Sequence, residues 1–166
     1  MTTALLVIDV QNDYFPGGAL PLWNADATLD AIVAAIGRAR SRGEHVMLVQ
    51  HIAAAADSPL FQAGTDGVAL HARIISAAPD APVVVKRHTD SFHQTDLSRE
   101  LDRLGTTDLR LAGMMTQNCV VFTALSPAAA RYRVSVLSDC TTTTDGMIHG
   151  FALHALTTRV AVQPDA

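Results

Sequence analysis

Short apolar runs alternate along this chain with longer segments in which apolar residues recur at helical spacing. The short runs are rich in valine, isoleucine and leucine and show little polar alternation, as expected of strands buried on both faces of a parallel sheet. They occupy six ranges: Ala4–Val10, His45–His51, Pro82–Lys86, Leu109–Ala112, Val134–Leu137 and Thr158–Val162. Their alternation with helical segments predicts a three-layer α/β fold around a six-stranded, mostly parallel sheet.

The intervening segments predict five helices. The clearest is Asp26–Arg42, where apolar residues recur every three or four positions and Gly43 follows as a stop signal. The others are Val68–Ile75, Leu97–Leu104, Cys119–Tyr132 and Met147–Leu156. Pro127 has no amide hydrogen, so we predict a break after Ser126. The segment Ala53–Ile74 is too long for a tight connection, and long irregular segments of this kind are often binding loops.

Composition narrows the class of protein. The chain has 166 residues, of which 49% are hydrophobic and 17% charged, so we expect a single domain over residues 1–166. A net charge of −4, without a basic run, argues against nucleic acid or a membrane surface as a partner. The apolar runs are far shorter than the roughly 20 residues of a membrane span. No basic segment precedes the first run, so we expect no secretory leader and a cytoplasmic location.

Chemically useful residues follow the predicted strands. Asp9, His51 and Lys86 come at the ends of the first three strands, and Cys119 follows the fourth. In a parallel sheet these ends share one edge, where ligands bind. Each residue alone has an ordinary structural interpretation, as a capping carboxylate, a strand-end histidine, a surface cation or a small buried thiol. Their convergence on one edge favours a catalytic site.

The scarcity of lysine and cysteine strengthens this interpretation. Lys86 is the only lysine among 12 basic residues, and its compact ammonium suits a buried partnership with a carboxylate and a thiolate. Cys119 follows a turn that begins at Gly113, and amide groups at a helix start, with a nearby ammonium, would lower its pKa. The same amides can hold an oxyanion. Cys140 lacks this setting, so we interpret it as structural and expect no disulfide between the two cysteines.

Four segments resemble the isochorismatase-like cysteine hydrolase superfamily, in that family's order and with similar spacing. They are Leu6–Gly18, Val49–His51 with Ser58–Thr65, Val85–Thr95 and Gly113–Val120. The resemblance implies the strand order 3-2-1-4-5-6 and a catalytic triad of Asp9, Lys86 and Cys119. It also implies a cis peptide bond between Met114 and Met115, and an oxyanion hole made by the backbone N–H groups of Met115 and Cys119.

The resemblance further implies a mechanism. Asp9 would accept the Cys119 proton, Lys86 would hold both groups, and the thiolate would attack a carbonyl carbon to give a thioester. The substrate would be a small amide or a related C–N compound, and we expect no cofactor. Family members commonly form dimers or tetramers, so we also expect a homo-oligomer. Around the triad we place four substrate-binding residues: Tyr14, His51, Phe92 and Gln117.

Departures from the family pattern leave alternatives open. Zinc-dependent nicotinamidases of this family carry an aspartate and two histidines at positions that read Val49, His51 and Leu60 here. One imidazole cannot supply three ligands, so we expect no metal and disfavour nicotinamidase activity. Vinyl-ether hydrolysis of the isochorismatase type, which would depend on Asp9 more than on Cys119, is the second hypothesis, and non-catalytic binding of a small molecule is the third. Nucleotide-binding glycine motifs are absent from the sequence.

Overall fold

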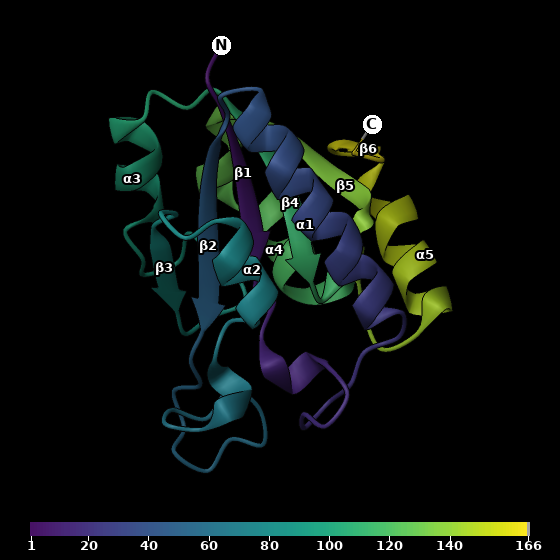
Figure 1. Cartoon of the computed structure of the whole chain (residues 1–166). Helices are drawn as coiled ribbons and strands as arrows, with labels where there is room; N and C mark the ends of the chain where they lie inside the picture. The colour runs from purple at the N-terminus through teal and green to yellow at the C-terminus, as the bar shows by residue number, and fades with distance from the viewer. Residues whose placement is uncertain (166) are drawn as a thin grey trace.

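The computed structural model describes residues 1–165, which form a six-stranded sheet flanked by helices (Figure 1). The strands are β1 (Thr3–Ile8), β2 (His45–His51), β3 (Val83–Lys86), β4 (Asp108–Met114), β5 (Arg133–Thr142) and β6 (Ala161–Gln163). Neighbouring strands are parallel and follow the order β3-β2-β1-β4-β5-β6. The predicted fold class and strand order are therefore confirmed.

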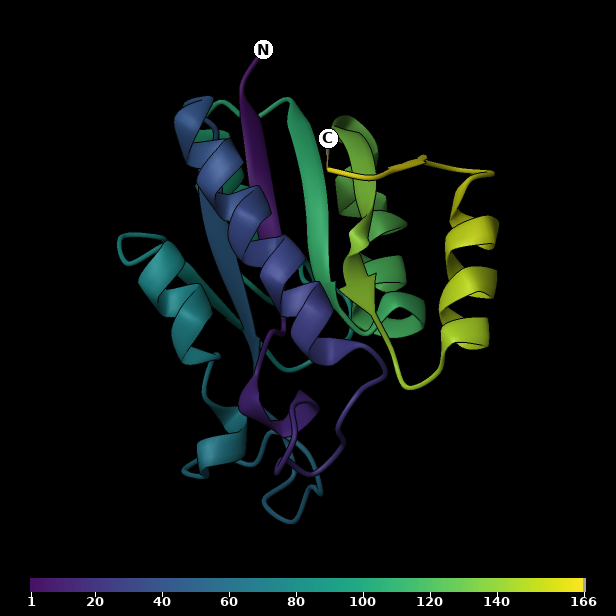
Figure 2. The same ribbon diagram turned by 45° about the vertical axis from the view of Figure 1, so that its right-hand side comes forward.

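Helices cover both faces of this sheet. They are α1 (Ala25–Ser41), α2 (Ala72–Ala77), α3 (Leu97–Arg103), α4 (Val121–Ala124) and α5 (Gly146–Leu156). One buried cluster joins the sheet to α1 and α2, and a second joins the opposite face to α3 and α4. Figure 2 shows α1 and α2 in front of the sheet, with α5 beside β5 and β6. Within the described residues, no helix has the length and apolarity needed to cross a membrane.

Two predicted helices differ in detail from the structure. The helix expected over Cys119–Tyr132 is interrupted near Pro127, as predicted, because α4 stops at Ala124 and a 3-10 helix, η4 (Pro127–Arg131), follows. The Ser126 hydroxyl accepts a hydrogen bond from the Ala128 amide and caps this second piece. The helix expected over Val68–Ile75 is divided into a 3-10 turn, η2 (Asp66–Val68), and the later α2.

Close contact between β1 and β4 fixes the edge of the sheet where the candidate residues lie. Gly113 pairs with Ile8 in the strand register and has a φ of +124°. A Cβ atom at Gly113 would lie 2.0 Å from the Ile8 carbonyl oxygen, so only glycine fits there. Asp9 follows directly after β1, and Met114 is the last residue of β4. The segments that carry the acid and the thiol therefore begin side by side.

Candidate active site

The three predicted catalytic residues meet at the carboxyl edge of the sheet. Asp9 follows β1, Lys86 ends β3, and Cys119 lies after β4. The Lys86 Nζ atom is 2.7 Å from Asp9 Oδ2 and 3.2 Å from Cys119 Sγ. Asp9, Lys86 and Cys119 are only 0%, 1% and 2% exposed, respectively. An acid, an ammonium and a thiol therefore share one buried centre, and they come from three segments far apart in the sequence.

The backbone is irregular at Asp9 and in the segment that leads to Cys119. Asp9 adopts a left-handed conformation, with φ of 52°, and its amide donates to the Val49 carbonyl oxygen at 3.0 Å. The peptide bond between Met114 and Met115 is cis, as the resemblance implied. Cys119 lies within a π-helical turn, η3 (Thr116–Val120). The expectation that Cys119 begins an α-helix is therefore wrong, because α4 begins only at Val121.

Lys86 is the electrostatic centre of the site. Besides Asp9 and Cys119, its ammonium contacts His51 Nδ1 at 3.0 Å and donates to the His88 carbonyl oxygen at 3.0 Å. Burial alone lowers the pKa of Lys86, but Asp9 and Cys119 outweigh burial and the pKa is raised. Lys86 is therefore charged at neutral pH. Asp9 Oδ2 meets it as an ion pair, while Asp9 Oδ1 has no hydrogen-bond partner among residues 1–165.

Cys119 rests as a thiol in this arrangement. Burial raises the pKa of Cys119, the Asp9 carboxylate raises it further, and Lys86 only partly opposes them. The expectation of a lowered Cys119 pKa is therefore wrong for the resting site. Burial removes the thiolate from water, and the Asp9 charge offsets much of the Lys86 charge. A base must accept the proton before the sulfur can act as a nucleophile, and Asp9 is in place to do so.

Of the four residues predicted to bind substrate, Tyr14 and His51 lie nearest the triad. His51 contacts Lys86 directly, and Tyr14 is buried with a pKa raised by that burial and by the charges of Asp9 and Cys119. Gln117 is partly exposed on η3, and its Oε1 atom is buried without a hydrogen-bond partner among residues 1–165. Its Nε2 donates to Met115 Sδ at 3.8 Å, and the side chain lines an apolar hollow between α4 and α5, so a role for Gln117 in substrate binding stays a prediction.

Phe92 has a different environment. Its ring stacks on Tyr132, with centroids 6.1 Å apart and planes inclined by 18°. Tyr132 directly precedes β5 and therefore lies at the opposite, amino end of that strand. Phe92 and Cys119 both belong to the large buried cluster on the α3 and α4 side of the sheet. A direct role for Phe92 in substrate binding stays a prediction.

Three residues that support the site were missed by sequence reasoning. Gln11 makes two hydrogen bonds to the backbone of His51. Its side chain accepts one from the His51 amide and donates one to the His51 carbonyl oxygen, both at 2.8 Å. The Asp13 carboxylate accepts from the Phe61 amide at 2.7 Å. Phe61 then packs against the rings of Tyr14 and His51, at 4.9 and 5.6 Å. The polar run directly after β1 was the available signal.

The candidate site also contains residue types that bind metal ions. Asp9, His51 and Cys119 each offer one potential ligand atom, and these atoms lie within 4.8 Å of one another. The Lys86 ammonium contacts all three residues, at 2.7, 3.0 and 3.2 Å. Because a bound cation and this ammonium would repel each other at such distances, the three residues fit a lysine-centred site better than a metal site.

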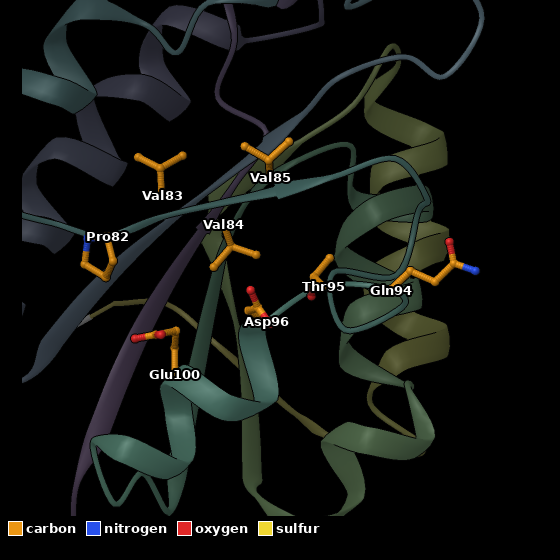
Figure 3. A pocket seen from close by; sticks show the side chains of 8 residues that line it. All are labelled: Pro82, Val83, Val84, Val85, Gln94, Thr95, Asp96 and Glu100. Atoms are coloured by element: carbon orange, nitrogen blue, oxygen red, sulfur yellow. The ribbon is translucent and has the colours of Figure 1, made fainter.

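A cleft elsewhere on the molecule is separate from this centre. It has a volume of about 610 Å³ and lies between β3 and α3, where Asp96 and Glu100 face Val84 (Figure 3). None of the three triad residues lines it. The cleft therefore reflects the exposed edge of the sheet at β3 and is not the candidate active site.

Comparison with known proteins agrees with the fold. The family model of the isochorismatase domain matches residues 3–165. A six-stranded parallel sheet of this order places the chain among isochorismatase-like hydrolases. The chain belongs to the isochorismatase family.

Individual relatives cover most of the chain. The isochorismatase family protein YddQ of Bacillus subtilis is 37% identical over 87% of this chain and 80% of its own length. A streptothricin hydrolase of Streptomyces noursei is 35% identical over 86% of this chain and 50% of its own. A nicotinamidase of Escherichia coli is 28% identical over 82% of this chain and 81% of its own length. The structure of an isochorismatase-like hydrolase from Alkaliphilus metalliredigens superposes with a TM-score of 0.89 at 27% identity, covering 99% of this chain and 94% of that one.

Proposed function

We propose that this protein hydrolyses a small amide or a related C–N bond, with Cys119 as the nucleophile. The observation that carries the proposal is the Lys86 ammonium, which lies 2.7 Å from Asp9 and 3.2 Å from Cys119 in a buried site. A base, a nucleophile and a group that stabilises negative charge are thereby within reach of one carbonyl carbon. Relatives named as a nicotinamidase and a streptothricin hydrolase support a hydrolytic activity.

The reaction would proceed in two halves. First, Asp9 takes the Cys119 proton, the thiolate attacks the carbonyl carbon, and the resulting oxyanion accepts from the backbone N–H groups of Met115 and Cys119. Asp9 then returns the proton to the leaving nitrogen as the C–N bond breaks, which leaves a thioester on Cys119. In the second half, Asp9 takes a proton from water, the hydroxide attacks the thioester, and Cys119 leaves with that proton.

The thioester gives the proposal a direct test. The protein would be incubated with small primary amides and carbamoyl compounds, quenched in acid, and digested for mass spectrometry. We expect the acyl mass on the peptide that contains Cys119, and none on the peptide that contains Cys140. Turnover of isochorismate with no adduct on Cys119 would instead support vinyl-ether hydrolysis, in which Asp9 protonates the substrate carbon.

We also propose that the protein forms a homo-oligomer through an apolar surface on α4 and α5. We define this α4–α5 face by five exposed side chains: Phe122, Leu125, Met147, Ile148 and Phe151. Met147 and Phe151 are 70% and 69% exposed. At roughly 200 Å² for each fully exposed large side chain, the face presents on the order of 500 Å² of apolar surface, near the upper end for a monomer.

A second copy of this chain is the occupant that fits the face. An apolar hollow of about 250 Å³ lies between α4 and α5, lined by Gln117, Val121, Leu125, Ala152, Ala155 and Leu156. The exposed Phe122 and Phe151 are sequence neighbours of Val121 and Ala152 in this lining. A surface that carries both protruding apolar side chains and an apolar hollow suits the self-complementary contact of a two-fold dimer. The helix Gly146–Leu156 carries no charged Asp, Glu, Lys or Arg, which argues against a charged partner. The face supplies most of the ~800 Å² that each partner buries in a standard interface.

Replacing Phe151 with glutamate is expected to convert the oligomer into a monomer, because the carboxylate would be buried unpaired in the interface. Sedimentation or light scattering measures the mass directly. Ile75→Glu is the matched control, since Ile75 is an exposed apolar residue on α2, outside the α4–α5 face. A wild-type protein that is monomeric up to roughly 100 μM would contradict the proposal.

A further inference from the structure

The ammonium of Lys86 has more acceptors than hydrogens. It carries three N–H bonds, yet four acceptors lie within 3.2 Å of Nζ: Asp9 Oδ2, His51 Nδ1, the His88 carbonyl oxygen and Cys119 Sγ. A carboxylate and a carbonyl oxygen are strong acceptors, whereas a thiol sulfur is a weak one. In the resting site, therefore, His51 and Cys119 compete for one N–H of Lys86.

The chemistry of His51 suits it to accept this hydrogen. Burial lowers the pKa of His51, and the adjacent Lys86 charge lowers it further, while Asp9 opposes them more weakly. The imidazole is therefore neutral near pH 7. Because Nδ1 faces an ammonium, Nδ1 is the acceptor and the ring proton is on Nε2. The charged and titratable groups that face this ring are Asp9 at 4.0 Å, Lys86, His88 and Cys119.

The fold holds His51 in this position from several sides. Its strand pairs it with Lys86 in the register of β2 and β3. The fully buried Gln11 side chain binds both backbone groups of His51, and Phe61 packs against its ring. The His51–Lys86 contact is therefore built into the buried structure and does not depend on a mobile surface side chain.

We propose that His51 is a positioning residue that holds one N–H of Lys86 away from Cys119 until the thiolate forms. Once the Cys119 proton has moved to Asp9, the thiolate is the stronger acceptor and takes this N–H from His51. No proton leaves Lys86 in this exchange, because only the direction of one hydrogen bond changes. The role rests on the proposed function, in which Cys119 is the nucleophile. It predicts that removing the His51 acceptor makes the thiolate easier to form.

The test compares two variants of nearly equal shape, His51→Leu and His51→Asn. Both substitutions replace the imidazole ring with a smaller side chain, but only asparagine keeps a hydrogen-bond acceptor near the position of Nδ1. Iodoacetamide alkylation of Cys119, followed by mass spectrometry from pH 5 to pH 10, reports the thiolate. We expect the alkylation profile of His51→Leu to lie about one pH unit lower than that of His51→Asn, with a rate at pH 7 about tenfold higher.

Controls separate this role from a loss of structure. Alkylation of Cys140 serves as an internal reference, because it should not differ between the two variants, and thermal unfolding shows whether both are folded. If either does not fold, the longer pair His51→Met and His51→Gln makes the same comparison. Equal or slower alkylation of the leucine variant would overturn the proposal. Full turnover by Cys119→Ala would instead reject the proposed function, while the alkylation comparison would still report on His51.

Discussion

Replacing Cys119 by alanine is expected to lower turnover by at least about four orders of magnitude, as removal of a covalent nucleophile does in other hydrolases. The remaining site still has Asp9 and Lys86, but no atom that can form the thioester. The fold should persist, since the change removes one sulfur atom from a cluster that the sheet, α3 and α4 still fill. Turnover of the amide that forms the Cys119 adduct, together with thermal unfolding, measures both effects.

Cys140→Ala is the matched control for this change. Cys140 is also buried, and burial together with the neighbouring Asp139 raises its pKa to about 12. Among residues 1–165 it has no ammonium partner of the kind that Lys86 provides to Cys119, so the variant should retain turnover. If Cys119→Ala retained turnover as well, the thioester mechanism would be wrong, and acid catalysis by Asp9 alone would become the better explanation.

The sheet could be predicted from the sequence because its strands are apolar runs buried on both faces. Five of the six ranges correspond closely to strands, and the weak run Thr158–Val162 overlaps the observed β6 (Ala161–Gln163) by only two residues. Helix boundaries were less certain where the chain is irregular. His71 caps α2 by accepting from the Arg73 amide, and no periodic pattern indicates such a cap. Local signals therefore defined the buried elements and missed part of the loop between β2 and β3.

The triad could be located from sequence because parallel strands deliver their end residues to one edge. The environment of those residues could not be predicted from the sequence, because their burial depends on segments that are distant along the chain. The raised pKa of Cys119 follows from complete burial beside Asp9, which no local motif reports. The support of His51 by Gln11 and Phe61 likewise joins residues 40 and 10 positions away from it in the chain. Long-range contacts determine the chemistry of the site more than its residue types do.

Lys86→Met is expected to lower the free energy of unfolding by about 3–5 kcal/mol, as breaking a buried ion pair does when one charge is left alone. Both side chains of the pair have no solvent exposure, so the variant would leave Asp9 in a buried site without its counterion. Turnover should be lost as well, because the thiolate would have no ammonium beside it. Urea unfolding at pH 7 measures the first effect, and the amide assay measures the second.

The double variant Asp9→Asn/Lys86→Met distinguishes a broken ion pair from poor packing. With both charges removed, no lone charge is buried, so stability should recover by at least about 2 kcal/mol relative to Lys86→Met. No recovery would mean that methionine simply packs badly.

The stabilisation of the fold by Lys86 also has a defined pH range. Because the folded site raises the pKa of Lys86, its stabilisation is present below the ordinary lysine pKa and is lost only as the pH rises through the higher, folded value. The difference between wild type and Lys86→Met should therefore persist through neutral pH and shrink only in strongly alkaline solution.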